Sequence, residues 1–197
     1  MNDPFDRVRA ALATTSAPTS DFELNSGVFV PDQPTRAAGV LIPLEMIAGQ
    51  LWVILTKRSS ALKHHPGQIA FPGGKVDPGD ADSTAAALRE AEEEIGLPRG
   101  NVEVLGHLPE HDTVTNFRVQ PVVGRVLTPF EVRPEPGEVE EAFRVPLAHL
   151  CDPANYLVEG RRWRGTRRSY YVVPYGPYYI WGATARMCRV LADRLAP

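Results

Sequence analysis

The chain has 197 residues, of which 43% are hydrophobic and 23% charged, the composition of an ordinary globular protein with a sizeable core. Its formal net charge of −3 provides no overall basic field, which argues against nucleic acid as a partner. Cys151 and Cys188 lie outside any zinc-type or C-x-x-C spacing, which predicts two reduced thiols in a cytoplasmic protein. The N-terminus lacks the apolar core of a secretory signal, and the apolar stretch 37–49 is too short to span a bilayer, so we expect no membrane partner.

Residues 1–36 are expected to form a short helix and a linker. A helix is predicted over residues 5–12, because Asp3 can cap its N-terminus and Pro4 suits its first turn. Residues 14–21 are rich in Ser, Thr and Pro, which predicts a polar linker.

A hairpin and a long loop are predicted next. Apolar runs at 37–47 and 51–56 are separated by the tripeptide Ala-Gly-Gln at 48–50, a pattern typical of two strands joined by a turn. Residues 59–70 are too polar for a core element. A loop of this length suggests a functional role.

The second half of the chain alternates helices and strands. A helix is predicted over 83–95, capped by Asp82 or Ser83 and ended by Gly96 and Pro98. The remaining predicted elements are strands at 102–108, at 117–127 and within 156–173, a loop at 129–137, a short helix from Val145 to about Leu150, and a helix at 180–195. Strands interrupted by two major helices predict an α/β layered domain, and without a repeat or second domain we expect a single domain over 1–197.

The end of the predicted helix 83–95 concentrates acidic residues. Positions three and four apart share a helix face, so Glu90, Glu93 and Glu94 are expected to project together. Hard divalent cations such as Mg²⁺ prefer carboxylate oxygens and often bridge to substrate phosphates. These acids therefore predict a metal site facing a phosphate ester, although from the acids alone a solvated helix face is the commoner meaning of such a pattern.

Two glycines upstream of the helix complete a pattern of fixed spacing. Gly73 and Gly74 can let a ligand approach the main chain closely. Residues 73–97, GGKVDPGDADSTAAALREAEEEIGL, resemble the Nudix hydrolase signature, G-x5-E-x7-R-E-U-x-E-E-x-G-U with U an aliphatic residue. The positions that match are Gly74, Arg89, Glu90, Ala91, Glu93, Glu94, Gly96 and Leu97.

This resemblance implies both a fold and a reaction. The fold would be the Nudix fold, a mixed β-sheet sandwiched between α-helices. The reaction would be hydrolysis of a pyrophosphate bond, with Mg²⁺ or Mn²⁺ held by Glu90, Glu93 and Glu94. Arg89 would orient a carboxylate through an ion pair, although a simple surface pair with Glu93 is the alternative.

The loop before the helix departs from the signature. Asp80 stands where the signature has Glu, and eight residues instead of seven separate it from Arg89. Asp80 or Asp82 is therefore the candidate for the acid of this loop.

The preceding residues 54–74, ILTKRSSALKHHPGQIAFPGG, resemble the second motif of the coenzyme A pyrophosphatase branch of Nudix enzymes, roughly L-L-T-x-R-S-x3-R-x3-G-x3-F-P-G-G. Lys63 replaces the second Arg of the motif, which keeps the charge but loses the planar fork suited to phosphate. The residues expected to contact substrate are cations, hydrogen-bond donors and glycines of this segment: Lys57, Arg58, Lys63, His64, Gln68, Gly73 and Gly74.

A further acid is expected from the segment PEPGEVEEAFRVPL, and the family resemblance favours Glu138 over Glu140 and Glu141 as a catalytic residue. The sequence does not choose the general base among Glu90, Glu93, Glu94 and Glu138. The arginines of 161–168 suit phosphate binding but are more typical of an exposed hairpin. His111 and His149 are expected to be structural.

Three functions follow from the resemblance. The first is hydrolysis of coenzyme A or acyl-CoA to adenosine 3',5'-bisphosphate and (acyl-)phosphopantetheine, by a cytoplasmic enzyme that the family resemblance suggests could be a homodimer. The second is hydrolysis of another substrate, such as ADP-ribose, a dinucleotide polyphosphate or an oxidised nucleotide. The third is a nucleotide-sensing module without catalysis, which the retention of Glu90, Glu93 and Glu94 disfavours.

Overall fold

The computed structural model describes residues 3–25, 34–163 and 165–196. Its helices are α1 (Pro4–Leu12), α2 (Ser83–Ile95), α3 (Leu147–Cys151) and α4 (Gly182–Leu195), with 3-10 turns at Arg99–Asn101 and Pro153–Asn155. Its strands are β1 (Thr19–Ser20), β2 (Arg36–Ile47), β3 (Gln50–Arg58), β4 (Ile69–Ala70), β5 (Gly73–Lys75), β6 (Val102–His107), β7 (His111–Asp112), β8 (Phe117–Val126), β9 (Val139–Pro146), β10 (Leu157–Trp163) and β11 (Thr166–Val172).

Strands β1 to β9 form one mixed sheet. Its order is β1-β7-β8-β2-β3-β4, with β5 paired to β2, β6 paired to β8 and β9 paired to β3. The long strands β2 and β8 run parallel at its centre, whereas β3 is antiparallel to both β2 and β9.

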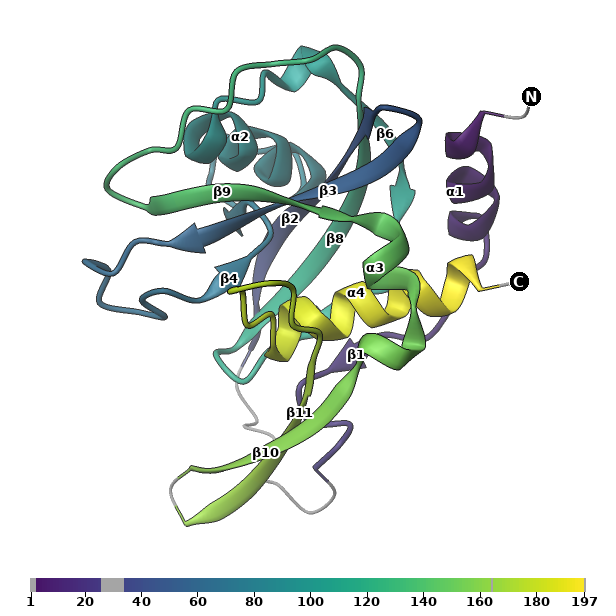
Figure 1. Cartoon of the computed structure of the whole chain (residues 1–197). Coiled ribbons are helices and arrows are strands. Elements are labelled where there is room, and N and C mark those ends of the chain that lie inside the picture. The colour runs from purple at the N-terminus through teal and green to yellow at the C-terminus, as the bar shows by residue number, and fades with distance from the viewer. Residues whose placement is uncertain (1–2, 26–33, 164, 197) are drawn as a thin grey trace.

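Helices cover both faces of this sheet. Figure 1 shows α2 on one face and α1, α3 and α4 gathered on the other. Successive residues of β2 point to opposite faces, so Leu41 packs in a buried cluster with Ala87 and Ala91 of α2, whereas Ile42 packs in the larger cluster that includes α1 and α4. The predicted α/β sandwich is thereby confirmed.

Short-range capping signals predicted the helix boundaries well. The Asp3 carboxylate accepts from the Phe5 amide at 3.1 Å at the start of α1. The Asp82 carboxylate accepts from the Ala85 amide at 2.8 Å at the start of α2. Gly96 follows α2 in the left-handed conformation, with φ of 70°, which is the usual reason for glycine at a helix end.

Elements that depend on distant partners were predicted less well. β1 lies in the segment predicted as the linker 14–21, and it pairs in parallel with β7. β4 lies within the segment predicted as the loop 59–70. The prediction missed β9, and the short helix begins at Leu147 instead of Val145. β9 forms because β3 supplies a complete antiparallel partner for it, which short-range patterns do not reveal.

The predicted arginine-bearing hairpin is confirmed as β10 and β11, a separate two-stranded sheet that projects from the rest of the structure (Figure 1). Its register pairs Arg161 with Arg168 and Arg162 with Arg167. Among the helices of the described residues, none is both long and apolar enough to cross a membrane.

Candidate active site

The double glycine places the main chain of β5 against α2. β5 pairs with β2, with Gly74 opposite Gly39. A Cβ atom on Gly74 would lie 2.4 Å from Oε1 of Glu90. Because no real Cβ approaches an atom so closely, glycine here lets the Glu90 carboxylate lie directly against the backbone of the turn.

Three carboxylates from two distant segments meet beside this turn. Glu90 and Glu94 stand on successive turns of α2, and each can place an oxygen within 4.8 Å of the others and of one from Glu138. Glu94 is 4% exposed, whereas Glu138 lies at the exposed side of the group. We call these three residues the carboxylate cluster.

The predicted trio of α2 glutamates is therefore not the group that comes together. Glu93 is not one of the three residues of the carboxylate cluster; its Oε2 lies 3.0 Å from Nη1 of Arg89, the nitrogen that also binds Glu90, and its side chain is 56% exposed. Helix spacing alone does not separate it, because Glu93 stands three residues from Glu90 on the same face; the observed difference is its ion pair with Arg89. A role for Glu93 as a metal ligand stays a prediction.

Arg89 uses all of its N–H groups to hold this arrangement. It binds Asp80 through Nε and Nη2, each at 3.0 Å, and the Lys75 carbonyl through Nη2 at 3.2 Å. Its Nη1 donates to Glu90 at 2.9 Å and to Glu93 at 3.0 Å. Hydrogen bonding to Asp80 is the largest cause of a raised pKa for Arg89, so its charge is permanent here.

The ambiguity between the two loop acids is resolved by these contacts. Asp80, with a side chain that is 4% exposed, binds Arg89 in a two-point geometry, and the Arg89 hydrogen bond is the largest cause of its lowered pKa. The Asp77 amide also donates to Asp80 at 2.8 Å. Asp82 caps α2 instead. Sequence spacing could not separate these two roles, because the loop is one residue longer than the signature.

The electrostatics of the carboxylate cluster favour a bound cation. Burial, followed by the charge of Glu90, raises the pKa of Glu94 to about 8, against an opposing effect of Arg58. Burial also raises the pKa of Glu90. Oε2 of Glu94 is buried without a hydrogen-bond partner among the described residues. Three converging carboxylates, one with a free buried oxygen, are a donor set that fits a hard divalent cation such as Mg²⁺ or Mn²⁺.

The upstream motif lies beside the carboxylate cluster. The main chain of Arg58 pairs with that of Gln68 at 3.0 Å, and the Ser59 amide donates to the Glu138 carbonyl at 2.8 Å. The charge of Arg58 acts on Glu94, yet its Nε is buried without a hydrogen-bond partner in the described part of the chain. Arg58 thus places a positive charge beside the cluster, and its Nε–H group remains available to donate a hydrogen bond.

The other expected substrate contacts differ in availability. Lys57 is paired with Glu140 at 2.6 Å, and this hydrogen bond is the largest cause of its raised pKa. Lys63 and His64 are exposed in the loop before β4. Gln68 contributes its carbonyl to the pairing with Arg58. Gly73 pairs with Val40 in the turn beside α2.

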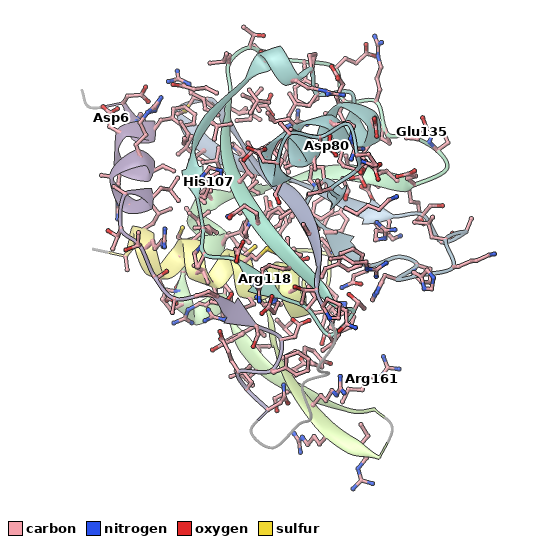
Figure 2. All side chains as sticks on the ribbon, turned by 180° about the vertical axis from the view of Figure 1, so that it is seen from behind. Asp6, Asp80, His107, Arg118, Glu135 and Arg161 are labelled. Carbon is pink, nitrogen blue, oxygen red and sulfur yellow. The ribbon has the colours of Figure 1, made fainter. Side chains whose placement is uncertain are left out.

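The hairpin that carries Arg161, Arg162, Arg167 and Arg168 projects away from the carboxylate cluster. Figure 2 shows Asp80 at the α2 end of the molecule and Arg161 on the hairpin that projects from the other end. His111 is fully buried between Thr19 at 2.8 Å and Asp21 at 3.0 Å, as expected for a structural histidine. His149 likewise hydrogen-bonds the Pro174 carbonyl at 2.9 Å.

Comparison with known proteins gives a consistent result. Residues 34–164 match the NUDIX domain family model. The chain is 43% identical over 157 residues to the protein named Uncharacterized Nudix hydrolase NudL of Escherichia coli K12, covering 80% of this chain and 81% of the relative. The same identity and coverage hold for NudL of Enterobacter sp. 638. A MutT/nudix family protein of Enterococcus faecalis shares the fold, with a TM-score of 0.53 and 16% identity over 85% of this chain and 63% of that one. The chain belongs to the Nudix hydrolase family.

Proposed function

We propose that this Nudix hydrolase is a coenzyme A diphosphatase, which splits coenzyme A or its thioesters into adenosine 3',5'-bisphosphate and (acyl-)phosphopantetheine. The observation that carries the hydrolase function is the buried, unpartnered oxygen of Glu94 within the carboxylate cluster, next to the glycine turn. The coenzyme A assignment depends on the upstream motif, whose Arg58 acts on that same carboxylate. In this proposal residues 1–197 form one Nudix domain that works in the cytoplasm, and a homodimer stays a prediction.

Glu90, Glu94 and Glu138 would hold the cation, with Glu93 as a further proposed ligand after release from Arg89. Nudix hydrolases generally use divalent metals; when bound, such a cation offsets the negative charge of the phosphates and makes water easier to deprotonate. Arg89 is a positioning residue, because its contacts with Asp80 and Glu90 fix where the Glu90 carboxylate lies. The base that takes the proton of the attacking water is one of these four glutamates.

Arg58 is the proposed contact for the pyrophosphate. Its unpartnered Nε can donate to a phosphate oxygen, a charge-assisted hydrogen bond of the stronger kind. Lys63 and His64 lie exposed in the adjoining loop and would meet the additional ribose phosphate that distinguishes coenzyme A from ADP-ribose. Lys57 would join them only by leaving Glu140.

A product assay tests the proposal. Purified protein is incubated with coenzyme A, with and without Mg²⁺, in parallel with ADP-ribose and a dinucleotide polyphosphate, and products are identified by mass. We expect Mg²⁺-dependent release of adenosine 3',5'-bisphosphate and phosphopantetheine. Glu94→Gln should abolish it, whereas Glu92→Gln, an exposed glutamate of α2 that pairs with Arg99, should not.

Other outcomes have different meanings. Cleavage of ADP-ribose or a dinucleotide, with coenzyme A left intact, would be consistent with the proposed metal site but would refute coenzyme A as the substrate. Tight nucleotide binding without turnover of any compound would favour the sensing module instead.

A further inference from the structure

Glu138 reaches the carboxylate cluster on the segment that joins β8 to β9, residues 127–138, which we call the β8–β9 loop. The loop is fixed where it begins. The Asn101 carbonyl accepts from the Leu127 amide at 2.9 Å. The Asn101 side chain accepts from the Thr128 amide at 3.0 Å and donates to the Thr128 carbonyl at 2.8 Å.

The middle of the loop packs against the hydrophobic cluster between α2 and the sheet. Phe130 and Val132 are partly buried against the hydrophobic cluster that contains Ala91 and Ile95 of α2. Ala91 and Ile95 are fully buried, and the same cluster includes Leu41 and Val122 of the sheet, so the loop closes the core that lies between α2 and the sheet.

Main-chain hydrogen bonds tie the same part of the loop to the end of α2. The Arg133 amide donates to the Ile95 carbonyl at 3.0 Å, and the Glu135 amide donates to the Glu94 carbonyl at 2.9 Å. The last carbonyls of a helix have no partner within the helix, so the loop satisfies groups that would otherwise need water. A Cβ on Gly96 would lie 3.3 Å from Cβ of Arg133, so a larger residue at the helix end would crowd the loop.

The end of the loop presents Glu138 in a fixed place. The amides of Glu138 and Val139 both donate to the Glu135 carbonyl, at 3.0 and 2.8 Å, and the Ser59 amide donates to the Glu138 carbonyl at 2.8 Å. Three prolines within the loop restrict the backbone further. They are Pro129, Pro134 and Pro136.

From these contacts we propose that Phe130 and Val132 are positioning residues, which dock the β8–β9 loop on α2 and so carry Glu138 to Glu90 and Glu94. The cation site is then a single unit built on α2, although its ligands come from two distant segments. The inference rests on the proposed function only through the role of Glu138 as a metal ligand, and it does not depend on the substrate.

The test is the affinity for Mn²⁺, measured by calorimetry or electron paramagnetic resonance on the full chain. Val132→Ala is compared with Val102→Ala, because Val102 is also partly buried against the same hydrophobic cluster but lies on β6 and not in the β8–β9 loop. Both variants should lose similar thermal stability. Val132→Ala should bind Mn²⁺ about 10-fold more weakly, which is typical for loss of a group that orients a ligand, whereas Val102→Ala should bind it as the wild type does.

Two further variants complete the test. Phe130→Ala should weaken Mn²⁺ binding as Val132→Ala does, and Val132→Ile should retain wild-type affinity. In a chain that carries Glu138→Gln, which by itself should weaken Mn²⁺ binding by about 10-fold or more, adding Val132→Ala should have no further effect.

The outcomes distinguish the positioning role of Phe130 and Val132 from the proposed role of Glu138 as a metal ligand. Equal Mn²⁺ affinities for Val132→Ala and Val102→Ala, with a large loss in Glu138→Gln, would overturn the positioning role and leave the ligand intact. Unchanged affinity in Glu138→Gln would overturn both, because Glu138 would then not be a ligand. A further loss from Val132→Ala in the Glu138→Gln chain would show that the loop acts on other groups, which also overturns the inference.

Discussion

Glu94→Gln should stabilise the metal-free protein, and increasingly so as the pH rises. The pKa of Glu94 in the folded chain is about 8, against an ordinary value of 4.5. Between these values folded Glu94 holds a proton that the unfolded chain has released, so raising the pH through this range lowers the stability of the wild type. Glutamine does not titrate. From pH 5 to pH 8 the difference in the free energy of unfolding between the two proteins should therefore grow by about 3–4 kcal/mol in favour of Glu94→Gln.

Urea denaturation in EDTA at pH 5, 6, 7 and 8 measures this difference. Glu92→Gln is the matched control, because Glu92 stands on the same helix with a side chain that is 44% exposed and paired with Arg99. Losing such an exposed pair should change stability by at most about 1 kcal/mol. A difference between wild type and Glu94→Gln that stays constant within about 1 kcal/mol over this pH range would refute the argument that buried charge at Glu94 is the main strain of the metal-free site.

Two substitutions test the supports of Glu90. Asp80→Asn should weaken Mn²⁺ binding about 10-fold, because Arg89 loses its two-point partner and no longer fixes the Glu90 carboxylate; calorimetry showing unchanged affinity would contradict this. Gly74→Ala should have a similar effect of about 10-fold, since its Cβ would displace Glu90, whereas Gly79→Ala, where a Cβ meets nothing within 4 Å, should bind Mn²⁺ normally. Equal Mn²⁺ affinities in Gly74→Ala and Gly79→Ala would show that the close approach of Gly74 to Glu90 is not needed for metal binding.

The features predictable from sequence were those that depend on neighbouring residues. The caps of α2 at Asp82 and Gly96 follow from side-chain and backbone preferences that act within one turn. β9 was missed because its formation depends on β3, far away in the chain, and because Glu140 and Glu141 interrupt its apolar pattern. Short-range preferences cannot reveal a partner at that distance.

The site shows the same division. The spacing of Glu90 and Glu94 was enough to place them together, since a helix fixes the relation of positions four apart. Glu138 was singled out only through the family resemblance, because nothing in its own segment reveals that the β8–β9 loop docks on α2. The division of roles between Asp80 and Asp82 also required the structure. Both acids lie in the loop before α2, and the sequence does not show which of them binds Arg89 and which caps the helix.

The distribution of arginine side chains around α2 explains why the unfavourable buried charge falls on Glu94. Four acids lie within five positions at the end of this helix, yet Arg89 pairs with Glu90 and Glu93, and Arg99 pairs with Glu92. Glu94 is the member of the four without an ion pair among the described residues, and it is also the most buried. Of these four acids, the described residues thus leave Glu94 alone without a paired cation, at the position where a bound cation would be held by ligands from both α2 and the β8–β9 loop. A site of this kind should gain stability from the bound cation itself, so the melting temperature of the wild type should rise with Mn²⁺ at pH 8 by more than that of Glu94→Gln.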